Sequence, residues 1–532
     1  MDNFSNSQIV RKQVIATRGG VVAAQHRRAA EVGAAVLEAG GDAVDAAIAT
    51  SFAIGVVEPW MSGPAAGGCM TLWRADSNKA EVVDYGMCAP GALNPADYPL
   101  TGDGRLADLF PWPAVVGERN VQGATAVAVP GVVAGMALAH QRHGRMPWRA
   151  LVQPAVGLAQ QGLLADWYSG LLTASTARAL SQDPDAAAMF LDDGVFPIVG
   201  GWTAAQARHL DQSAMARTLQ QIAEEGADAF YQGEIAQALV RDVQSKGGCL
   251  SLDDLRNYRA AWVEPLALDY HGSRIHAPPG LTGGPTLAAA LSHLMAHTAA
   301  QARPRGAPDA ASTLALARAL HAAFDARLQG MGDHESPGAP GCTTHFSIVD
   351  RHGNMCAVTQ TLLSMFGSRV VSPSTGLLLN NGIMWFDPEP GKPNSLGPGK
   401  RCLANYCPVV GVANDGRRFA LGASGGRKIM GAVLQLTSFL VDHDMDLESA
   451  FHQPRIDVSG NQRQLIADPV LPEAVRHALA AEFEISLERR QPHPYAYACP
   501  SGVLREDEMN SGCTEVSSPW GDAIAEQSDA GN

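Results

Sequence analysis

The fold is decided by Thr343-Thr-His-Phe-Ser-Ile-Val-Asp350, a stretch that lies well inside the chain. Its β-branched and apolar residues predict a strand over residues 343–349, and the polar and glycine residues that follow predict a turn over 350–354. Residues 355–363 again favour a strand. Together the three segments predict a β-hairpin.

The predicted hairpin brings two threonines together. If its loop is centred on His352, Val349 faces Met355 and Thr343 faces Thr361. Directly opposed side chains lie on the same face about 5 Å apart, so Thr361 is placed to hydrogen-bond Thr343. A bulge or a slip of one residue would turn Thr361 to the other face. Threonine is also common in strands simply because it is β-branched, and this is the simpler explanation of an isolated Thr-Thr pair.

Thr343 has the chemistry of a latent N-terminal nucleophile. Cleavage of the bond between Cys342 and Thr343 would give Thr343 a free α-amino group beside its own hydroxyl, so that one residue supplies both base and nucleophile. The chain would then be an amidase proenzyme. Cleavage there gives a large fragment, residues 1–342, and a small fragment, residues 343–532.

Motifs on both sides of this point resemble the γ-glutamyltranspeptidase family. In the small fragment they are Ser372–Asn381, Pro398–Arg401 and Gly422–Arg427, and in the large fragment Glu38–Ala47, Val129–Gly131, Gly144–Trp148 and Gly247–Tyr258. In that family a Thr-Thr-His segment begins the small subunit after self-cleavage, and its first Thr is the nucleophile. The resemblance covers roughly residues 15–515 and implies the same role for Thr343, with Thr361 as the second catalytic threonine.

The resemblance also implies an α+β fold of the Ntn-hydrolase type, a four-layer αββα sandwich. The large and small subunits would form it jointly as one composite structural domain. Sequence periodicity alone predicts only a mixed α and β protein, with helices over Arg28–Ala39 and Ala43–Val57. Asp42 is the predicted N-cap of the second helix.

Gly425 and Gly426 are candidates for an oxyanion hole. They follow the strand-like residues 419–421 and precede a predicted helix over 428–441, so their amide groups are placed to converge on developing negative charge. Two adjacent glycines on their own more often mark a tight turn. The resemblance assigns the matching glycines to the oxyanion, and this favours the catalytic interpretation.

These residues predict an acyl-transfer cycle. The hydroxyl of Thr343 attacks an amide carbonyl, and its α-amino group, with a reference pKa of about 7.7–8.0, takes and returns the proton. An acyl-enzyme forms, and water or an amine acceptor then releases the acyl group. No metal or cofactor is expected. His345 lies on the same predicted face as Thr343, and a structural hydrogen-bonding role is expected for it.

The chain departs from the γ-glutamyl-binding pattern of the family. Gly86 stands where an Arg is expected, and Ala404-Asn405 stand where the family has a Ser-Ser pair. Leu363 replaces an Asn, and Gly382 and Trp385 occupy the region that usually grips the α-amino group. With these polar groups removed, little offsets the desolvation of a zwitterion, so glutathione is a doubtful substrate.

The expected substrate is instead a neutral or aromatic acyl amide, or the amide of a small acid held by one polar contact. The pattern resembles the transpeptidase-like acylases and oxamate amidohydrolases more than the glutathione-degrading members. The predicted substrate-binding residues, any of which may also be ordinary core, are Asn405, Trp385, Leu363, Asn381 and Gly382.

The charge, the first residues and the cysteines of the chain indicate which partners and which cellular compartment to expect. The formal net charge of -14 opposes nonspecific binding to nucleic acid or anionic membrane. The first residues lack a basic segment followed by an apolar core, and the nine cysteines form no CxxC pair, so a reducing cytoplasmic location is expected. The expected partners are a small amide substrate, an acceptor, and the two subunits of one precursor, with a higher oligomer left open.

Two alternatives to the leading hypothesis remain at this point. One is a γ-glutamyltransferase or glutathione hydrolase in which other loops supply the lost contacts. The other is an unprocessed binding protein that has kept only the fold. Segments expected to be irregular are residues 301–311, the glycine- and proline-rich stretch up to Gly341, and residues 519–532.

Overall fold

A computed structural model describes residues 10–105, 112–200, 207–298, 305–331, 342–458 and 464–527. Two sheets of paired antiparallel strands form its centre. The first contains, in order, β11 (Ala261–Val263), β4 (Lys79–Tyr85), β3 (Gly67–Arg74), β15 (Met355–Leu363), β14 (Cys342–Val349), β2 (Val21–Ala24) and β25 (Asp522–Ala525). The second contains β1 (Ile15–Thr17), β24 (Met509–Thr514), β23 (Cys499–Glu506), β19 (Arg418–Ser424), β18 (Val409–Val412), β13 (Ser273–Ala277) and β12 (Leu266–Tyr270).

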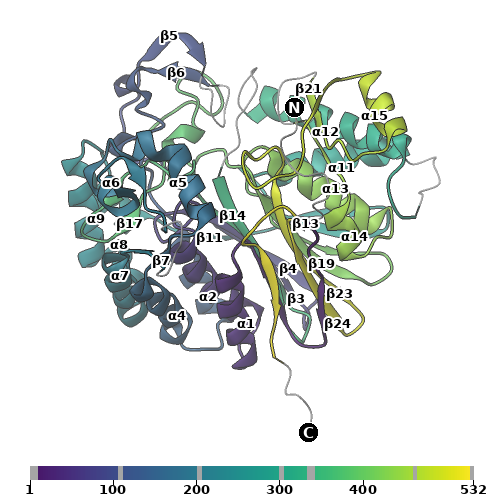
Figure 1. The fold of residues 1–532 in the computed structure, drawn as a ribbon, viewed down its shortest axis with the longest axis horizontal. Coiled ribbons are helices and arrows are strands. Elements are labelled where there is room, and N and C mark those ends of the chain that lie inside the picture. The colour runs from purple at the N-terminus through teal and green to yellow at the C-terminus, as the bar shows by residue number, and fades with distance from the viewer. Residues whose placement is uncertain are drawn as a thin grey trace.

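Helices cover the two sheets from opposite sides, as Figure 1 shows. One outer layer contains α1 (Arg27–Glu38), α2 (Ala43–Val57), α3 (Val132–His143), α4 (Trp148–Gln161), α5 (Trp167–Leu180), α6 (Pro184–Phe190), α7 (Ser213–Glu225), α8 (Ala227–Tyr231), α9 (Glu234–Ser245) and α10 (Leu252–Asn257). The other contains α11 (Gly284–Thr298), α12 (Ala310–Met331), α13 (Lys428–Val441), α14 (Leu447–His452) and α15 (Glu473–Ala480). The expected four-layer αββα sandwich is confirmed.

Three apolar layers hold the sandwich together. Phe346 and Ile348 of β14 point to the core under α2, while Val349 belongs to a smaller core between the two sheets. The second sheet packs against α12 and α13 through a separate core that includes Phe419 and Leu421. Because side chains alternate along a strand, Thr343 shares the intersheet face with Val349, and Thr344 shares the helix face.

The hairpin register matches its prediction. Val349 pairs with Met355, and the ladder continues in step to Thr344 opposite Gln360. Cys342 then pairs with Leu363, so the register shifts by one residue at Thr343. Extra residues of this kind bend a strand and re-aim its side chains, and they are frequent beside active sites.

The helices nearest the site were also predicted from sequence. Both α2 and α13 have the predicted bounds, and α1 begins one residue earlier than expected and ends one residue earlier. Asp42 forms a capping box with Asp45, which satisfies backbone N–H groups at the start of α2. All of α2 is buried, which explains its almost wholly apolar composition.

The expectation for the end of the chain was wrong. Residues 519–532 were predicted to be polar and frayed, but β25 pairs with β2 along the edge of the first sheet. Ala523 is buried there and joins the intersheet core. The apolar alternation is only four residues long, too short to stand out in a polar segment. Residues 528–532 lie outside the described part of the chain.

The two other segments expected to be irregular lie partly outside the described residues. Residues 305–309 precede α12, which begins at Ala310, and 299–304 are not described. The stretch from 332 to 341, before the predicted cleavage point, is not described either. The remaining short strands form small separate sheets: β5 (Leu100–Arg105), β6 (Pro113–Val115), β7 (Leu163–Leu164), β8 (Leu191–Asp192), β9 (Phe196–Pro197), β10 (His209–Leu210), β16 (Val371–Ser372), β17 (Leu377–Leu378), β20 (Ile456–Asp457), β21 (Gln464–Ala467) and β22 (Glu484–Leu487).

Both central sheets combine strands from before and after Thr343. In the first sheet β14 lies between β2 and β15, and β15 pairs in turn with β3. In the second sheet β1, β12 and β13 come from the large fragment and the other strands from the small one. A cut before Thr343 therefore leaves the two fragments interleaved. No helix of the described residues is both long and apolar enough to span a bilayer.

Candidate active site

Thr343 is a buried residue at the start of β14, at the point where the register shifts. Its Oγ1 donates a hydrogen bond to Oγ1 of Thr361 over 3.4 Å. The Thr361 hydroxyl oxygen also accepts the backbone N–H of Leu363 at 2.8 Å. The predicted pair is thus in contact, and the second threonine is held in place by the bulged end of β15. The side chain of Cys342 lies outside the described residues.

We expect Thr361 to orient the hydroxyl of Thr343. In Thr361→Val that partner is lost and the Leu363 N–H loses its acceptor, so the rate of self-cleavage should fall about tenfold or more. Thr361→Ser keeps the hydroxyl and should cleave at nearly the wild-type rate. Electrophoresis of samples taken during a cleavage time course measures both rates. Equal rates for Val and wild type would contradict the role.

Gly425 and Gly426 lie at the same end of the sandwich as Thr343. Gln25, one residue beyond β2, donates to Ser424 Oγ at 2.5 Å and to the Cys499 carbonyl at 2.7 Å. Because β2 pairs with β14, this links the end of β19 to the start of β14. Further along the same two strands, the His345 ring of β14 packs directly on Gly422 of β19. A Cβ on Gly422 would lie only 2.2 Å from that ring.

The backbone conformation at the glycine pair favours glycine. Gly425 has φ +125° and Gly426 has φ +59°, both in the region that L side chains rarely adopt. A Cβ on Gly425 would lie 2.9 Å from Cα of Ala498. Helix α13 starts at Lys428, so the partial positive charge of its N-terminus lies next to the pair. The local geometry suits an oxyanion hole, which is the role predicted from sequence.

His345 has a structural environment, in agreement with expectation. Its Nδ1 contacts Thr359 Oγ1 at 2.9 Å and its Nε2 contacts Ser347 Oγ at 3.0 Å. Complete burial lowers the pKa of His345 to about 3. The imidazole is therefore neutral at physiological pH with both nitrogens engaged.

Glu58 is a feature of the site that the sequence reasoning missed. It follows the last residue of α2, is fully buried, and its Oε2 accepts the Thr344 hydroxyl at 3.1 Å. Burial raises the pKa of Glu58 to about 7, and the hydrogen bond from Thr344 partly opposes that shift. The one sequence signal was an acidic residue directly after an almost wholly apolar helix, which is unusual without a partner.

Glu58 should make the stability of the uncleaved chain depend on pH. Its pKa is higher in the folded state than its ordinary value of 4.5, so its charging opposes folding. In Thr343→Ala, the free energy of unfolding should fall by about 3 kcal/mol as pH rises from 4.5 to 7. Adding Glu58→Gln should remove this part of the slope. Urea titrations at several pH values measure it, and parallel slopes for the two chains would contradict the assignment.

The predicted apolar residues form one cluster beside the threonines. Leu363, Trp385 and Ala404 pack together with Met87 and Tyr406. The Trp385 ring meets the Tyr406 ring edge-on at 5.2 Å, and its buried Nε1 has no hydrogen-bond partner among the described residues. Gly67 pairs with Thr361, and a Cβ on Gly67 would lie 2.6 Å from the Met87 side chain. The cluster therefore lies directly against the second threonine.

Asn381 and Gly382 are tied into the scaffold. Asn381 Oδ1 accepts the Ser364 amide at 3.0 Å, and its Nδ2 donates to the Val121 carbonyl and to Ser364 Oγ, both at 2.9 Å. The Gly382 amide donates to Asn380 Oδ1 at 2.9 Å. These bonds fix the loop that follows Leu363. In the described structure both residues shape the site through its backbone.

Asn405 has one engaged and one unused end. Its Oδ1 accepts a hydrogen bond from Arg327 Nη2 at 3.1 Å, while its buried Nδ2 has no partner in the described part of the chain. A buried amide donor without a hydrogen-bond partner destabilises the folded protein. The Nδ2 of Asn405 therefore marks a place where a ligand acceptor atom would supply the missing hydrogen bond. The sequence prediction of Asn405 as a polar contact for the acyl group stays a prediction.

Arg401 lies beside Gly86, the position where the family pattern has an Arg. A Cβ on Gly86 would lie 3.7 Å from Arg401 Nη1. That guanidinium is already engaged by the carbonyls of Gly86 at 3.1 Å and Arg259 at 2.7 Å, and Asp84 lies 3.6 Å away. It lies 5.7 Å from the centre of the Tyr258 ring. The Arg401 guanidinium therefore stabilises the backbone around Gly86. It does not take the place of the arginine that binds the substrate carboxylate in the family pattern.

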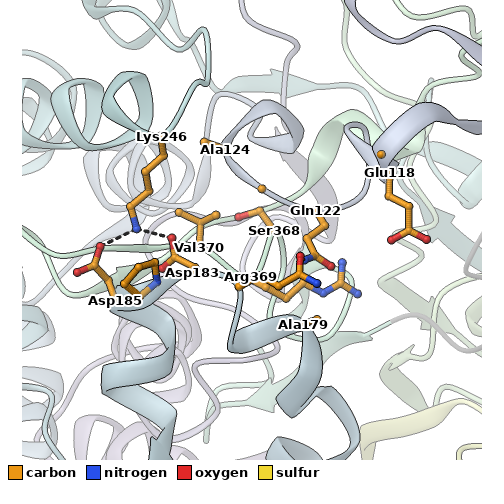
Figure 2. Close-up of a pocket in the computed structure, with 14 residues that line it drawn as sticks. Glu118, Gln122, Ala124, Ala179, Asp183, Asp185, Lys246, Ser368, Arg369 and Val370 are labelled. Atoms are coloured by element: carbon orange, nitrogen blue, oxygen red, sulfur yellow. Dashed lines mark hydrogen bonds and ion pairs between the residues drawn. The ribbon is translucent and has the colours of Figure 1, made fainter. Parts of the chain in front are cut away.

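A separate open pocket of about 490 Å³ is lined by residues that include Gln122, Lys246 and Arg369 (Figure 2). Arg369, one of its lining residues, donates to the same Val121 carbonyl as Asn381, at 3.1 Å. The Lys246 amino group lies between the carboxylates of Asp183 and Asp185, at 2.5 and 2.7 Å. None of the predicted site residues that the structure describes lines this pocket, so it is distinct from the threonine site.

Known proteins are similar to this chain in both sequence and fold. The gamma-glutamyltranspeptidase family model matches residues 29–342 and 337–515, two segments that meet just before Thr343. The acylase ACY 1 proenzyme of Pseudomonas sp. (strain V22) is 33% identical over 498 residues, covering 87% of this chain and 86% of that protein. The glutathione hydrolase proenzyme of Bacillus subtilis (strain 168) is 30% identical over 498 residues, covering 84% and 81%.

A solved structure extends the likeness to almost the whole chain. The cephalosporin acylase from Bacillus halodurans superposes with a TM-score of 0.83 at 25% identity, covering 99% of both chains. Acylases and glutathione hydrolases thus lie at similar sequence distances from this chain. The site residues, more than overall similarity, must distinguish between their substrates.

Proposed function

Because this chain belongs to the γ-glutamyltranspeptidase family, we propose that it cuts itself between Cys342 and Thr343 and then uses Thr343 to hydrolyse an amide that is not a standard γ-glutamyl peptide. Membership makes it a self-processing amidohydrolase or acyltransferase. The observation that carries the proposal is the buried Thr343 hydroxyl, which donates to Thr361 at a register shift in the strand.

The proposed first reaction is the cleavage of the precursor. The Thr343 hydroxyl attacks the carbonyl carbon of Cys342, the C–N bond to Thr343 breaks, and an ester to Oγ1 forms while the nitrogen becomes the free α-amine. Water then hydrolyses this ester, releasing the carboxylate of Cys342. Thr361 holds the attacking hydroxyl by the hydrogen bond described above.

The same groups then act on the substrate. The α-amine takes the proton of Oγ1 as the hydroxyl attacks the amide carbonyl, and the amides of Gly425 and Gly426 stabilise the oxyanion. Returning the proton to the leaving amine gives an acyl-enzyme. Water, activated by the same amine, releases the carboxylic acid, and an amine acceptor would give a transferred amide.

The substrate proposal rests on the lining of the site. The apolar cluster around Leu363 and Trp385 stands where a γ-glutamyl α-amino group would need acceptors. The side chain of Asn381 is hydrogen-bonded to the loop that follows Leu363, and the guanidinium of Arg401 is hydrogen-bonded to backbone carbonyls. The residues of the apolar cluster carry no carboxylate to pair with an ammonium, and burying an unpaired ammonium is costly.

The apolar lining of the described cluster predicts a clear ranking of two substrates that differ only in the α-amino group. We expect kcat/KM for glutaryl p-nitroanilide to exceed that for γ-glutamyl p-nitroanilide by about 100-fold. Spectrophotometric release of p-nitroaniline by cleaved wild-type enzyme measures both. A preference for the γ-glutamyl compound would favour the glutathione hydrolase alternative instead.

We also propose that the protein works in a reducing compartment such as the cytoplasm. Cys69, Cys356, Cys402 and Cys407 are buried free thiols. Burial raises the pKa of most of them, for example to about 12 for Cys407, which keeps them as unreactive thiols. Cell fractionation with an antibody against the chain tests the location.

A further inference from the structure

An apolar patch lies on the outside of the large fragment, over α5 and the β8–β9 hairpin. Its two largest members are Trp167, which is 63% exposed, and Phe196, which is 67% exposed. The other exposed apolar residues of this region are Leu164, Leu171, Val195 and Val199. Six of the fourteen large apolar residues that the described structure exposes thus fall between residues 164 and 199. Single exposed apolar residues are normal, whereas a cluster of them is typical of an interaction surface.

These residues form one surface because the hairpin packs against the helix. Trp167 and Leu171 are four positions apart, so they lie on the same side of α5, one turn from each other. Between them is Gly170, where a Cβ would lie 3.0 Å from Cγ1 of Val199. The missing side chain at Gly170 therefore lets Val199 rest directly on the helix. Phe196 lies on β9, the strand of the hairpin that packs against α5.

Helix α5 is apolar on two opposite sides. Tyr168 and Leu172 of its inner side are buried in the core of the large fragment. Trp167 and Leu171 of its outer side are exposed, and so is Ala174, one turn further on. A surface helix normally has one apolar and one polar side, and a helix that is apolar all round is normally buried. The outer side of α5 therefore has the composition of a covered surface.

The patch has the size that a stable pair of copies requires. The exposed fractions of its six residues correspond to roughly 500 Å² of apolar surface. A standard interface covers about 800 Å² of each partner, and about 65% of a homodimer interface is apolar. The patch thus supplies about the apolar area that one side of a two-copy interface needs. Trp167 is also of the residue type most enriched at the energetic centre of interfaces.

The rim of the patch carries charges of both signs. Asp192 and Asp193 are exposed in the turn of the hairpin, and Arg178 is exposed in the last turn of α5. Asp192 also forms an ion pair with Arg208 at 2.9 Å. A surface with both signs is complementary to a second copy of itself related by a two-fold rotation. An anionic membrane would instead favour a basic rim, and the net charge of -14 opposes it.

We propose that this patch joins two copies of the chain in a two-fold symmetric dimer, with α5 and the β8–β9 hairpin of each copy facing the same elements of the other. Trp167 and Phe196 would form the centre of the interface. None of the six patch residues is a predicted site residue, so this inference does not depend on the proposed function. Each copy keeps its own Thr343.

Sedimentation velocity of the purified wild-type protein tests the dimer. We expect a particle of twice the 55.8 kDa of one copy at about 10 μM, whether or not the chain has cleaved itself. The two fragments of one copy stay interleaved in the central sheets, so cleavage does not change the expected mass. A particle of one copy at every concentration up to about 50 μM would overturn the proposal.

Two substitutions test the patch itself. Phe196→Asp and Trp167→Ser should each raise the dissociation constant of the dimer by about 100-fold or more. Both side chains are mostly exposed, so self-cleavage and the thermal midpoint should stay at their wild-type values. Val470→Asp is the matched control, because Val470 is 73% exposed and precedes α15 in the other helical layer (Figure 1). Wild-type dimer affinity in both patch variants would overturn the proposal.

Hydrogen exchange at two concentrations locates the contact. Backbone amides of residues 167–178 and 191–199 should exchange more slowly at about 50 μM than at about 0.5 μM. Concentration-dependent protection confined to another surface would place the dimer elsewhere and overturn the proposal. Protection of the patch in a monomer would identify another segment of the same chain as its cover. Flotation with anionic phospholipid vesicles that is lost in Trp167→Ser would identify a membrane, and either result would also overturn the proposal.

Discussion

Thr343→Ala should give a single band of 532 residues, while the wild-type chain gives fragments of 342 and, by 532 minus 342, 190 residues. The variant lacks the hydroxyl that attacks the Cys342 carbonyl and never exposes the α-amine that would act as base. Amidase activity should therefore fall by about 10⁴-fold or more, because removing a nucleophile usually eliminates the covalent route. Denaturing electrophoresis and mass spectrometry of the small fragment, with Thr343 as its first residue, measure this.

Two further variants make this experiment decisive. Thr343→Ser retains a hydroxyl and should cleave, though more slowly. Thr71→Ala removes another buried threonine hydroxyl of the same sheet, one that donates to the Pro408 carbonyl at 2.8 Å, and should cleave normally. One intact band from folded wild-type protein without amidase activity would remove the proposed base and leave the unprocessed binding protein as the better hypothesis.

The second large effect is expected at the oxyanion glycines. In Gly425→Ala the new Cβ lies 2.9 Å from Cα of Ala498 and the residue must keep φ +125°, so the backbone has to move. Displacing one preorganised amide donor should lower kcat by about 100-fold or more. KM should change less than kcat, because the donors bind the charge that develops in the transition state. Steady-state kinetics on a cleaved preparation separate the two constants.

Gly416→Ala is the control for backbone strain. Gly416 has φ +92° in the turn before β19, and a Cβ there meets nothing within 4 Å. This variant should lose about 1 kcal/mol or more of stability through the left-handed conformation and keep its kcat. If Gly425→Ala and Gly416→Ala lose activity equally, the loss reflects strain and not the oxyanion site.

The sequence predictions that the structure confirms, the hairpin register and the bounds of two helices, depend on patterns of neighbouring residues. The hairpin register follows from strand alternation and a five-residue turn, and this register places Thr343 against Thr361. Helices α2 and α13 were bounded correctly because the Asp42 cap and the glycines before Lys428 interrupt apolar runs. Such signals lie within a few residues of one another, which is why a single sequence reveals them.

Side-chain partnerships between distant segments could not be predicted in the same way. Glu58 meets Thr344 across 286 positions of sequence, and nothing near either residue indicates the other. Arg427 was included in a family motif, but the position of its guanidinium, 6.0 Å from the centre of the Phe324 ring, appears only when α12 and α13 are packed together. The pairing of β25 with β2 joins the two ends of the chain, and its four-residue strand is recognisable only beside its partner.

The interleaving of the two sheets has a consequence for how this enzyme can be produced. A gene truncated after Cys342 would encode β2 and β3 without the neighbours that separate them, exposing unsatisfied backbone groups and apolar faces to the solvent. Such a half-protein is expected to aggregate, and mixing it later with its counterpart should not restore a native particle. Maturation must therefore follow assembly, with the intact polypeptide serving as its own template.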